Sequence, residues 1–145
     1  MEQVIKNISE LNEYAQMFIG GLKRQTAQAT IIGLSGELGS GKTAFTKVLA
    51  KNLGIDEEVS SPTFVIAKFY TLKDKQWSRL VHIDAYRIER PDELRALRWS
   101  ELTHDPKNLI VIEWPELMKE LFPNNATVLR FKFIDDTNRS ITNTI

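Results

Sequence analysis

The stretch that decides the fold is TIIGLSGELGSGKTAFTKVLAKNLG, residues 30–54. Residues 30–35 are mostly apolar and rich in β-branched side chains, which predicts a buried strand. Over residues 42–53 apolar side chains recur every four positions, as on one face of a helix, and Gly54 follows as a residue that ends helices. The stretch therefore predicts a strand, a glycine-rich loop and a helix in direct succession.

The loop between this strand and this helix, Gly36–Thr43, matches the pattern G-x-x-x-x-G-K-[ST] in full. Its glycines allow backbone conformations that turn successive N–H groups inward, at a helix N-terminus whose dipole favours anions. Lys42 can reach the β- and γ-phosphates, and the Thr43 hydroxyl can take one position on Mg²⁺. The loop thus predicts binding of a nucleoside triphosphate with Mg²⁺. The residues expected around the phosphates are Glu37, Leu38, Gly39, Ser40, Gly41, Lys42, Thr43 and Ala44.

Two further apolar runs, residues 80–83 and 109–112, each end in an acid, Asp84 and Glu113. Continuous apolar runs of this length are typical of strands covered on both faces. In an open parallel sheet, ligands bind outside the carboxyl ends of the strands, so both acids are expected beside the glycine loop. Phosphoryl chemistry needs an acid for the metal shell and a group that positions the attacking water, and these two residues are candidates for both tasks.

The remaining patterns predict elements around this centre. They are a helix capped by Ser9, a strand over 63–72 with a hairpin tip at 74–75, helices that begin at Pro91 and Pro115, and strands over 128–133 and 140–144.

Composition narrows the function classes. A length of 145 residues with 42% hydrophobic content predicts one domain, residues 1–145. Nineteen Lys and Arg balance nineteen Asp and Glu, so no broad positive field favours direct binding of nucleic acid. The absence of cysteine excludes disulfides and thiolate metal sites. No apolar run is long enough to span a bilayer, and we expect a cytoplasmic protein without membrane contact.

Three weaker patterns leave alternatives open. Residues 60–63, Ser-Ser-Pro-Thr, fit a loop that senses the γ-phosphate, and equally an ordinary proline turn. Four arginines between residues 87 and 98 alternate with acids, which favours a solvated face over a phosphate track. His82 lies inside a buried strand, a position more typical of a core histidine than of a catalytic one.

With these residues in view, the chain resembles the bacterial TsaE family, the ATPase component of the tRNA threonylcarbamoyladenosine biosynthesis machinery. The resemblance rests on four blocks in order, of which the last three are more specific than the glycine loop. They are residues 36–43 (GELGSGKT), 61–64 (SPTF), 82–87 (HIDAYR) and 112–116 (IEWPE).

The resemblance implies an α/β fold of the P-loop NTPase type, a three-layer sandwich whose sheet is mainly parallel with antiparallel strands at the edge. It implies an Mg-dependent ATPase that binds ATP and ADP, works weakly alone and is stimulated in complex. The implied partners are the TsaB and TsaD proteins, with tRNA reached indirectly through them. It also assigns roles to single residues: catalysis to Lys42, Asp84 and Thr63, Mg²⁺ binding to Thr43 and Glu113, and adenine contact to Ser9 and Arg139.

The chain departs from the family pattern at two places. Ala44 stands where the family often has a second threonine, which matters little if the backbone N–H there holds the α-phosphate. The segment 95–99 lacks the glycine that the family usually carries after the preceding helix, so its turn is not predicted.

Two other functions use the same loop. A small P-loop kinase would need a substrate lid with several arginines, and residues 89–105 leave little room for one. A nucleotide-gated binding module with incidental hydrolysis would share every motif named above. A regulatory GTPase is disfavoured because the sequence has no Asn-Lys-x-Asp.

Overall fold

A computed structural model of the chain describes residues 1–57, 66–73, 76–90 and 92–143. The described strands are β1 (Glu2–Ile5), β2 (Thr30–Ser35), β3 (Ala67–Thr71), β4 (Arg79–Asp84), β5 (Asn108–Glu113), β6 (Thr127–Phe133) and β7 (Arg139–Asn143). The described helices are α1 (Ile8–Gly21), α2 (Lys42–Asn52), α3 (Asp92–Ala96) and α4 (Trp99–Thr103), with 3₁₀ helices η1 (Ala85–Arg87) and η2 (Pro115–Leu121).

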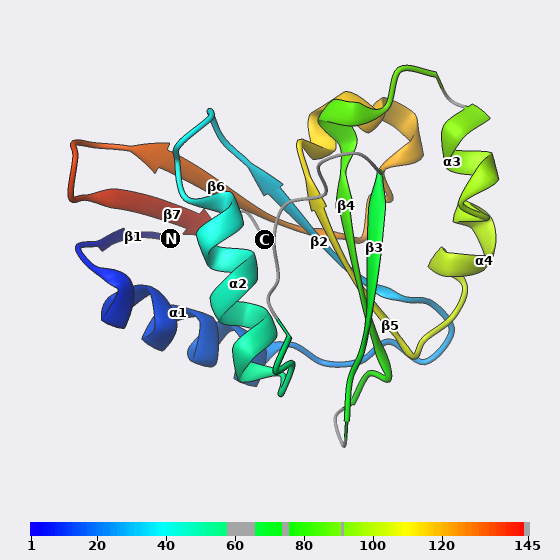
Figure 1. The fold of residues 1–145 in the computed structure, drawn as a ribbon, viewed down its shortest axis with the longest axis horizontal. Helices are drawn as coiled ribbons and strands as arrows, with labels where there is room; N and C mark the ends of the chain where they lie inside the picture. The colour runs from blue at the N-terminus through cyan, green and yellow to red at the C-terminus, as the bar shows by residue number, and fades with distance from the viewer. Residues whose placement is uncertain (58–65, 74–75, 91, 144–145) are drawn as a thin grey trace.

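Within the described residues, seven strands form one sheet in the order β1-β7-β6-β2-β5-β4-β3 (Figure 1). The central strands β6, β2, β5 and β4 run parallel. The outer pairs β1–β7, β6–β7 and β3–β4 are antiparallel. The fold is therefore mixed α/β, and antiparallel strands do stand at the edges.

The expectation of a mainly parallel sheet is not confirmed, because three of the six described pairings are parallel and three are antiparallel. The sequence pattern did not indicate β1. Its residues do not alternate between buried and exposed, because three exposed residues precede the buried Ile5. This short strand exists because it pairs with β7, and that pairing adds an antiparallel edge.

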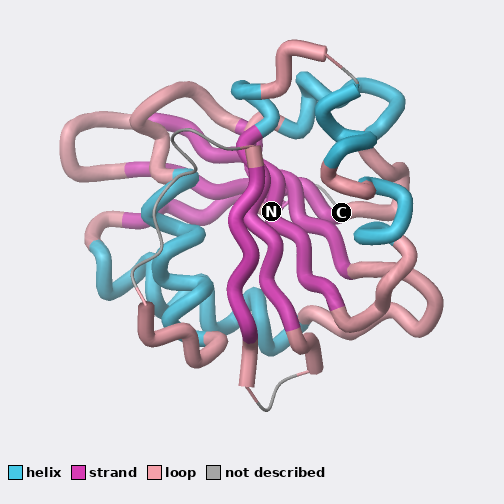
Figure 2. Tube along the Cα trace, turned by 45° about the vertical axis from the view of Figure 1, so that its right-hand side comes forward, coloured by secondary structure: helices cyan, strands magenta, loops and turns pink. Residues whose placement is uncertain are grey.

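Helices cover both faces of the sheet, whose strands run through the middle of the molecule (Figure 2). On one face, α1 and α2 pack through Phe18 and Phe45 against Leu34 of β2. On the other face, α3, α4 and η2 pack with Ile31 and Ile110 into a second core. Neighbouring residues of β2 thus point into different cores, as expected of a strand buried on both sides.

Several predicted boundaries need correction. Helix α1 is capped by Asn7, not by Ser9: the Asn7 side chain accepts a hydrogen bond from the Glu10 N–H at 2.9 Å. The Glu10 carboxylate in turn accepts from the Lys6 N–H at 2.9 Å, so the turn before the helix is fixed from both ends. Ser9 is an exposed residue of the first turn.

Other predicted elements are present with changed limits. The strand expected over 63–72 corresponds to β3. Residues 63–65 of the expected strand, and the expected hairpin tip at 74–75, lie outside the described residues. Pro91 also lies outside them, and α3 begins at Asp92. The helix at Pro115 is a 3₁₀ helix. In the described part of the chain, no helix has the length and apolar character needed to cross a membrane.

Candidate active site

The glycine loop links the end of β2 to the start of α2, as predicted. Gly36, Gly39 and Gly41 all have positive φ, and Gly41 is the N-cap residue of α2 at φ 108°. The first hydrogen bond of the helix runs from the Phe45 N–H to the Gly41 carbonyl at 2.9 Å. The N–H groups just before Phe45 have no intrahelical acceptor, which is the arrangement that holds anions at a helix N-terminus.

The start of the loop lies too close to β6 for any side chain. A Cβ atom on Gly36 would stand 2.5 Å from the Phe131 carbonyl oxygen and 2.7 Å from the Ser40 hydroxyl. Its φ of 149° is also in a range that side chains rarely adopt. Gly36 is therefore required by both space and conformation.

Lys42 is the first residue of α2, and its side chain is buried inside the loop. Its ammonium group donates hydrogen bonds to the carbonyls of Gly36 and Glu37, the latter at 3.3 Å. The same nitrogen lies 3.8 Å from the centre of the Trp114 ring. Burial lowers the pKa of the Lys42 ammonium below its ordinary value, and nearby carboxylates, Glu113 first, oppose that shift.

Strand register brings the two predicted acids to the loop. Glu113 of β5 is paired with Leu34 of β2 on one side and with Asp84 of β4 on the other. Both acids therefore lie at the strand ends beside the loop. The Thr43 hydroxyl lies 3.4 Å from Oε1 of Glu113, so the two residues predicted to share Mg²⁺ are in contact.

Asp84 is held by the turn that follows it. Its Oδ1 accepts a hydrogen bond from the Tyr86 N–H at 3.1 Å, and its Oδ2 lies 3.6 Å from Nε of Arg87. Burial raises the pKa of the Asp84 carboxyl, with a smaller contribution in the same direction from Glu113. Opposing this, the Tyr86 N–H stabilises the charged form.

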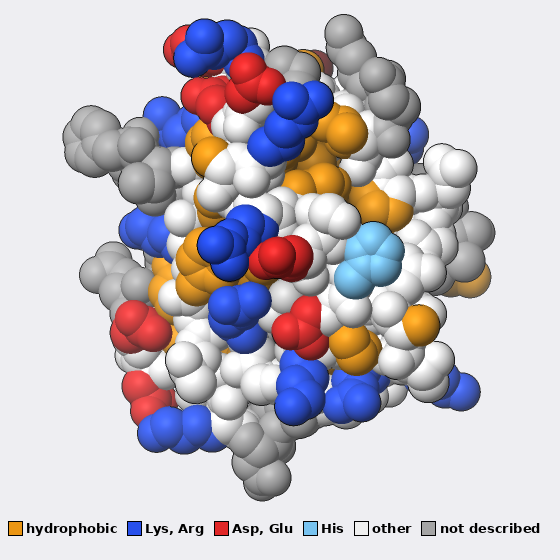
Figure 3. Space-filling model, turned by 90° about the vertical axis from the view of Figure 1, so that its right-hand side faces the viewer, with side chains coloured by type: hydrophobic (Ala, Val, Ile, Leu, Met, Phe, Trp, Pro, Cys, Tyr) orange, Lys and Arg blue, Asp and Glu red, His pale blue; other side chains and the backbone are white. Residues whose placement is uncertain are grey.

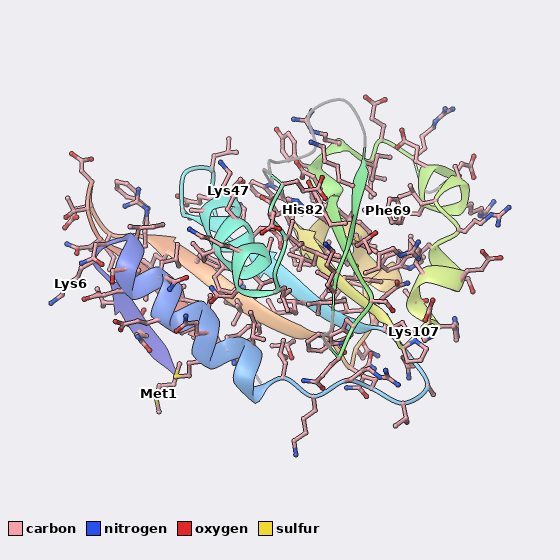
Figure 4. The ribbon with its side chains drawn as sticks, turned by 60° about the horizontal axis from the view of Figure 1, so that its bottom comes forward. Met1, Lys6, Lys47, Phe69, His82 and Lys107 are labelled. Atoms are coloured by element: carbon pink, nitrogen blue, oxygen red, sulfur yellow. The ribbon has the colours of Figure 1, made fainter. Side chains whose placement is uncertain are left out.

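The other oxygen of Glu113 meets His82. Nε2 of His82 lies 2.6 Å from Oε2 of Glu113, and both side chains are buried. Figure 4 shows His82 within the molecule, whereas Lys47 lies on the outer side of α2. The expectation of a core histidine holds for its burial, but its partner is an acid of the candidate site.

A cavity of about 630 Å³ opens along the glycine loop and extends to segments near the two chain ends. Arg139 lines it, and its Nε donates to the Gly39 carbonyl at 3.1 Å. Asn7 and Ile8 line the cavity from α1 and its cap. Ser9 is not among the lining residues, although its two predecessors are. The predicted residues that line it are Glu37, Leu38, Gly39, Ser40, Gly41, Lys42, Thr43, Ala44, Asp84, Glu113 and Arg139.

The sequence of the chain has known relatives. The model of the family described as "Threonylcarbamoyl adenosine biosynthesis protein TsaE" matches residues 5–141. The chain belongs to the TsaE family. Two relatives named tRNA threonylcarbamoyladenosine biosynthesis protein TsaE are similar over most of its length. The relative from Bacillus subtilis is 39% identical, over 77% of this chain and 67% of its own. That from Rickettsia typhi is 32% identical, over 90% and 85%.

A solved structure shares the fold of the chain. The crystal structure of YdiB from Bacillus subtilis superposes with a TM-score of 0.72 at 28% sequence identity. The match covers 99% of this chain and 83% of YdiB. The mixed α/β architecture is thus shared with an experimentally solved protein.

One predicted residue of the TsaE pattern, Thr63, lies outside the described residues. Conversely, Trp114 and Tyr86 line the cavity with their rings 5.4 Å apart, and the sequence analysis gave neither a role. Both follow a predicted acid closely, at Glu113 and Asp84. Position just after a strand-end acid is the signal that could have found them.

The donor set fits Mg²⁺ when it is bound with a nucleotide. Among the described residues, no three His, Asp or Glu side chains gather closely enough to hold a metal by themselves. Thr43 and Glu113 offer two hard oxygen ligands in contact. Mg²⁺ is usually bound through one or two protein oxygens, with phosphate and water completing its octahedron, and this pair suits that mode.

The arginines between residues 87 and 98 belong to a mixed surface. Figure 3 shows basic and acidic side chains interspersed on the face that carries α3 and α4. Arg95 pairs with Asp92 at 3.3 Å, and Arg98 with Glu101 at 3.6 Å. The expectation of a solvated face is confirmed for these two, and only Arg87 of the series lines the cavity.

Proposed function

We propose that this member of the TsaE family is an Mg-dependent ATPase that serves tRNA threonylcarbamoyladenosine biosynthesis. One observation carries the proposal: a positive-φ glycine loop, Lys42, and the Thr43–Glu113 pair together line a cavity of about 630 Å³. The relatives named above are tRNA threonylcarbamoyladenosine biosynthesis proteins, which supports the pathway. We also infer that residues 1–145 form one domain of the P-loop NTPase type.

Each residue at the loop has a task that its position supports. The loop N–H groups and the Lys42 ammonium would hold the β- and γ-phosphates of ATP, and ADP after hydrolysis. Thr43 and Glu113 would hold Mg²⁺, which when bound neutralises charge on the phosphate oxygens. Asp84, whose pKa is raised by burial, would orient the attacking water and receive its proton.

The cavity also has room for the base of the nucleotide where Arg139 and α1 line it beside the glycine loop. There Arg139 is fixed by two carbonyls of the β6–β7 turn, those of Asp135 at 2.6 Å and Asn138 at 3.1 Å. A guanidinium held in this way offers a planar surface for adenine. Ile8 and Leu11 provide apolar surface from α1. Ser9 stays a prediction for this contact.

We infer that hydrolysis drives the cycle of a complex of TsaB and TsaD proteins in the cytoplasm. The zero net charge supports an indirect route to tRNA, because no excess of basic side chains attracts a phosphate backbone. The Thr63 loop is proposed as the segment that responds to the γ-phosphate.

Calorimetry and turnover test this function together. The pure chain should bind Mg-ADP and Mg-ATP, hydrolyse ATP slowly, and hydrolyse it faster when TsaB and TsaD from the same organism are added. Absence of binding, alone and with the partners, would refute the proposal. Rapid turnover by the chain alone, with phosphate appearing on an added metabolite, would favour a kinase. Binding with no turnover even in the complex would favour a nucleotide-gated module.

A further inference from the structure

We propose that His82 is a positioning residue, which orients the Glu113 carboxylate so that its Oε1 atom faces Thr43. The inference rests on the proposed function, since it concerns how this chain prepares the Thr43–Glu113 pair for Mg²⁺. It assigns a role at the site to a side chain that the sequence analysis placed in the core.

The two oxygens of Glu113 are used in different directions. Oε2 lies 2.6 Å from Nε2 of His82, and Oε1 lies 3.4 Å from the Thr43 hydroxyl. A carboxylate bound at one oxygen by a fixed ring cannot rotate freely, so its other oxygen keeps its direction. The His82 contact therefore determines where the oxygen nearest to Thr43 stands.

Burial makes this contact strong and exclusive. His82 is completely buried and the Glu113 side chain is 5% exposed, so water does not compete for the hydrogen bond. The backbone of His82 is held within β4 by pairing with Lys68 of β3 and Val111 of β5, and its ring is enclosed, with 0% of the side chain exposed.

The two ring nitrogens of His82 have different surroundings, and only one of them contacts the candidate site. Nδ1 is buried and has no hydrogen-bond partner among the residues that the structure describes. Nε2 faces a carboxylate oxygen, which accepts hydrogen bonds, so we assign the ring proton to Nε2, which donates a hydrogen bond to Glu113. Most buried side-chain polar atoms have a hydrogen-bond partner, so the unpartnered Nδ1 is an exception. Here the described contacts of the ring reduce to one donor aimed at one acid of the site.

This asymmetry gives a sharp set of variants. In His82→Gln the side-chain amide can stand near the former Nε2 and still donate to Glu113. In His82→Asn the amide is too short and reaches only the level of Nδ1, where the described residues offer no partner. His82→Leu removes the donor altogether. The other histidine of the chain, His104, is exposed, and His104→Gln is the matched control.

Two calorimetric titrations on the full chain test the idea: ADP in EDTA, and Mg²⁺ into the ADP-loaded protein. His82→Leu and His82→Asn should weaken Mg²⁺ binding about 10- to 100-fold, as losses of outer partners of metal ligands usually do. His82→Gln should stay within about threefold of the unmodified chain, because the donor is kept. Affinity for ADP in EDTA should be unchanged in every variant.

Three results would overturn the inference. The first is Mg²⁺ affinity in both His82→Leu and His82→Asn equal to that of the unmodified chain. The second is an equal loss of ADP binding in EDTA, which would mean that His82 supports the cavity as a whole. The third concerns the double variant. If His82 acts only through the Glu113 carboxylate, adding His82→Leu to Glu113→Gln should weaken Mg²⁺ binding little further; a further loss as large as that of His82→Leu alone would contradict the inference.

Melting curves of each variant accompany the titrations. If His82→Leu does not fold, the comparison of His82→Asn with His82→Gln decides the matter. A different result would refute the proposed function itself: no Mg-dependent binding of ADP by the unmodified chain.

Discussion

The ammonium nitrogen of Lys42 lies 3.8 Å from the centre of the Trp114 ring. Trp114 reaches this place from a left-handed conformation at φ 62°, which costs a side-chain-bearing residue about 1–2 kcal/mol. The backbone N–H of Trp114 donates a hydrogen bond to the Leu34 carbonyl at 3.1 Å, so the strained residue also links β5 to the end of β2. Backbone strain of this kind tends to occur at functional sites, where the surrounding structure maintains it.

Lys42→Ala should abolish detectable hydrolysis and weaken nucleotide binding strongly. The reason is the loss of about 2–4 kcal/mol of charge stabilisation at the phosphates. Calorimetry with Mg-ADP and a phosphate-release assay measure the two effects. Lys47→Ala is the control, since Lys47 is an exposed lysine on the same helix. Equal ATPase rates in the two variants would contradict the assignment of the loop.

Nucleotide binding should change the fluorescence of Trp114, because the phosphates draw the Lys42 ammonium away from the indole ring. We expect Mg-ADP to alter the emission of the unmodified chain and to leave that of Trp114→Phe nearly constant. Calorimetry verifies that the variant still binds. Trp77 and Trp99 remain in it and lie outside the cavity lining. An undiminished signal in Trp114→Phe would place the response elsewhere.

The strand, loop and helix over residues 30–54 could be predicted because local signals agree there: apolar run, glycines and helical spacing all indicate one arrangement. The acids Asp84 and Glu113 could be predicted for the same reason. The contact of Glu113 with His82 could not, because it depends on the register of β4 against β5. Register is a long-range property that the strand sequences alone do not reveal.

The edges of the sheet were the least predictable part of the fold. Strand β1 has no apolar alternation and exists through its pairing with β7. The cap of α1 falls on Asn7 instead of Ser9, since both residue types are good caps and the local sequence does not choose between them. Helix α4 follows a left-handed turn at Arg98. Glycine is the usual residue in such a turn, and the sequence has none there to indicate it.

Gly33→Ala should lower the free energy of unfolding by about 1–3 kcal/mol, the usual effect of adding a carbon to a filled core. A Cβ at Gly33 would stand 2.8 Å from a ring carbon of Phe122 and 2.9 Å from Cγ of Pro115, whose rigid ring cannot move aside easily. Urea denaturation measures the change. Gly20→Ala is the control, because Gly20 lies in α1 with nothing within 4 Å of the added carbon. A neutral Gly33→Ala would mean that η2 can shift away from the sheet.

Asp135 should make the stability of the chain depend on pH in strongly acidic solution. Hydrogen bonds from the Asn138 side chain and from the Thr137 and Asn138 N–H groups lower the pKa of Asp135 from 3.8 to about 2. A group with a lowered folded-state pKa stabilises the fold above its unfolded pKa, and this contribution disappears as the pH falls through the folded value. The relevant window is therefore pH 4 to 2.

The measurement is the difference in melting temperature between the unmodified chain and Asp135→Asn. It should be constant above about pH 5 and shrink between pH 4 and 2, as the carboxylate of the unmodified chain becomes protonated. Asp136→Asn controls for the change of net charge at the same turn. A difference that stays constant down to pH 2 would show that the Asp135 hydrogen bonds do not distinguish its two charge states.

Arg98→Gly should stabilise the chain, because Arg98 joins α3 to α4 in a left-handed conformation at φ 57°. Relief of about 1–2 kcal/mol of strain is partly offset by the greater freedom of glycine in the unfolded chain, about 0.5–1 kcal/mol, so a net gain of up to about 1.5 kcal/mol is expected. The ion pair with Glu101 is exposed and its loss matters little. Arg98→Ala removes the same charge but keeps the strained conformation, and urea denaturation should show no gain for it. Equal stabilisation by both substitutions would assign the effect to charge, and the left-handed turn would then carry no measurable strain.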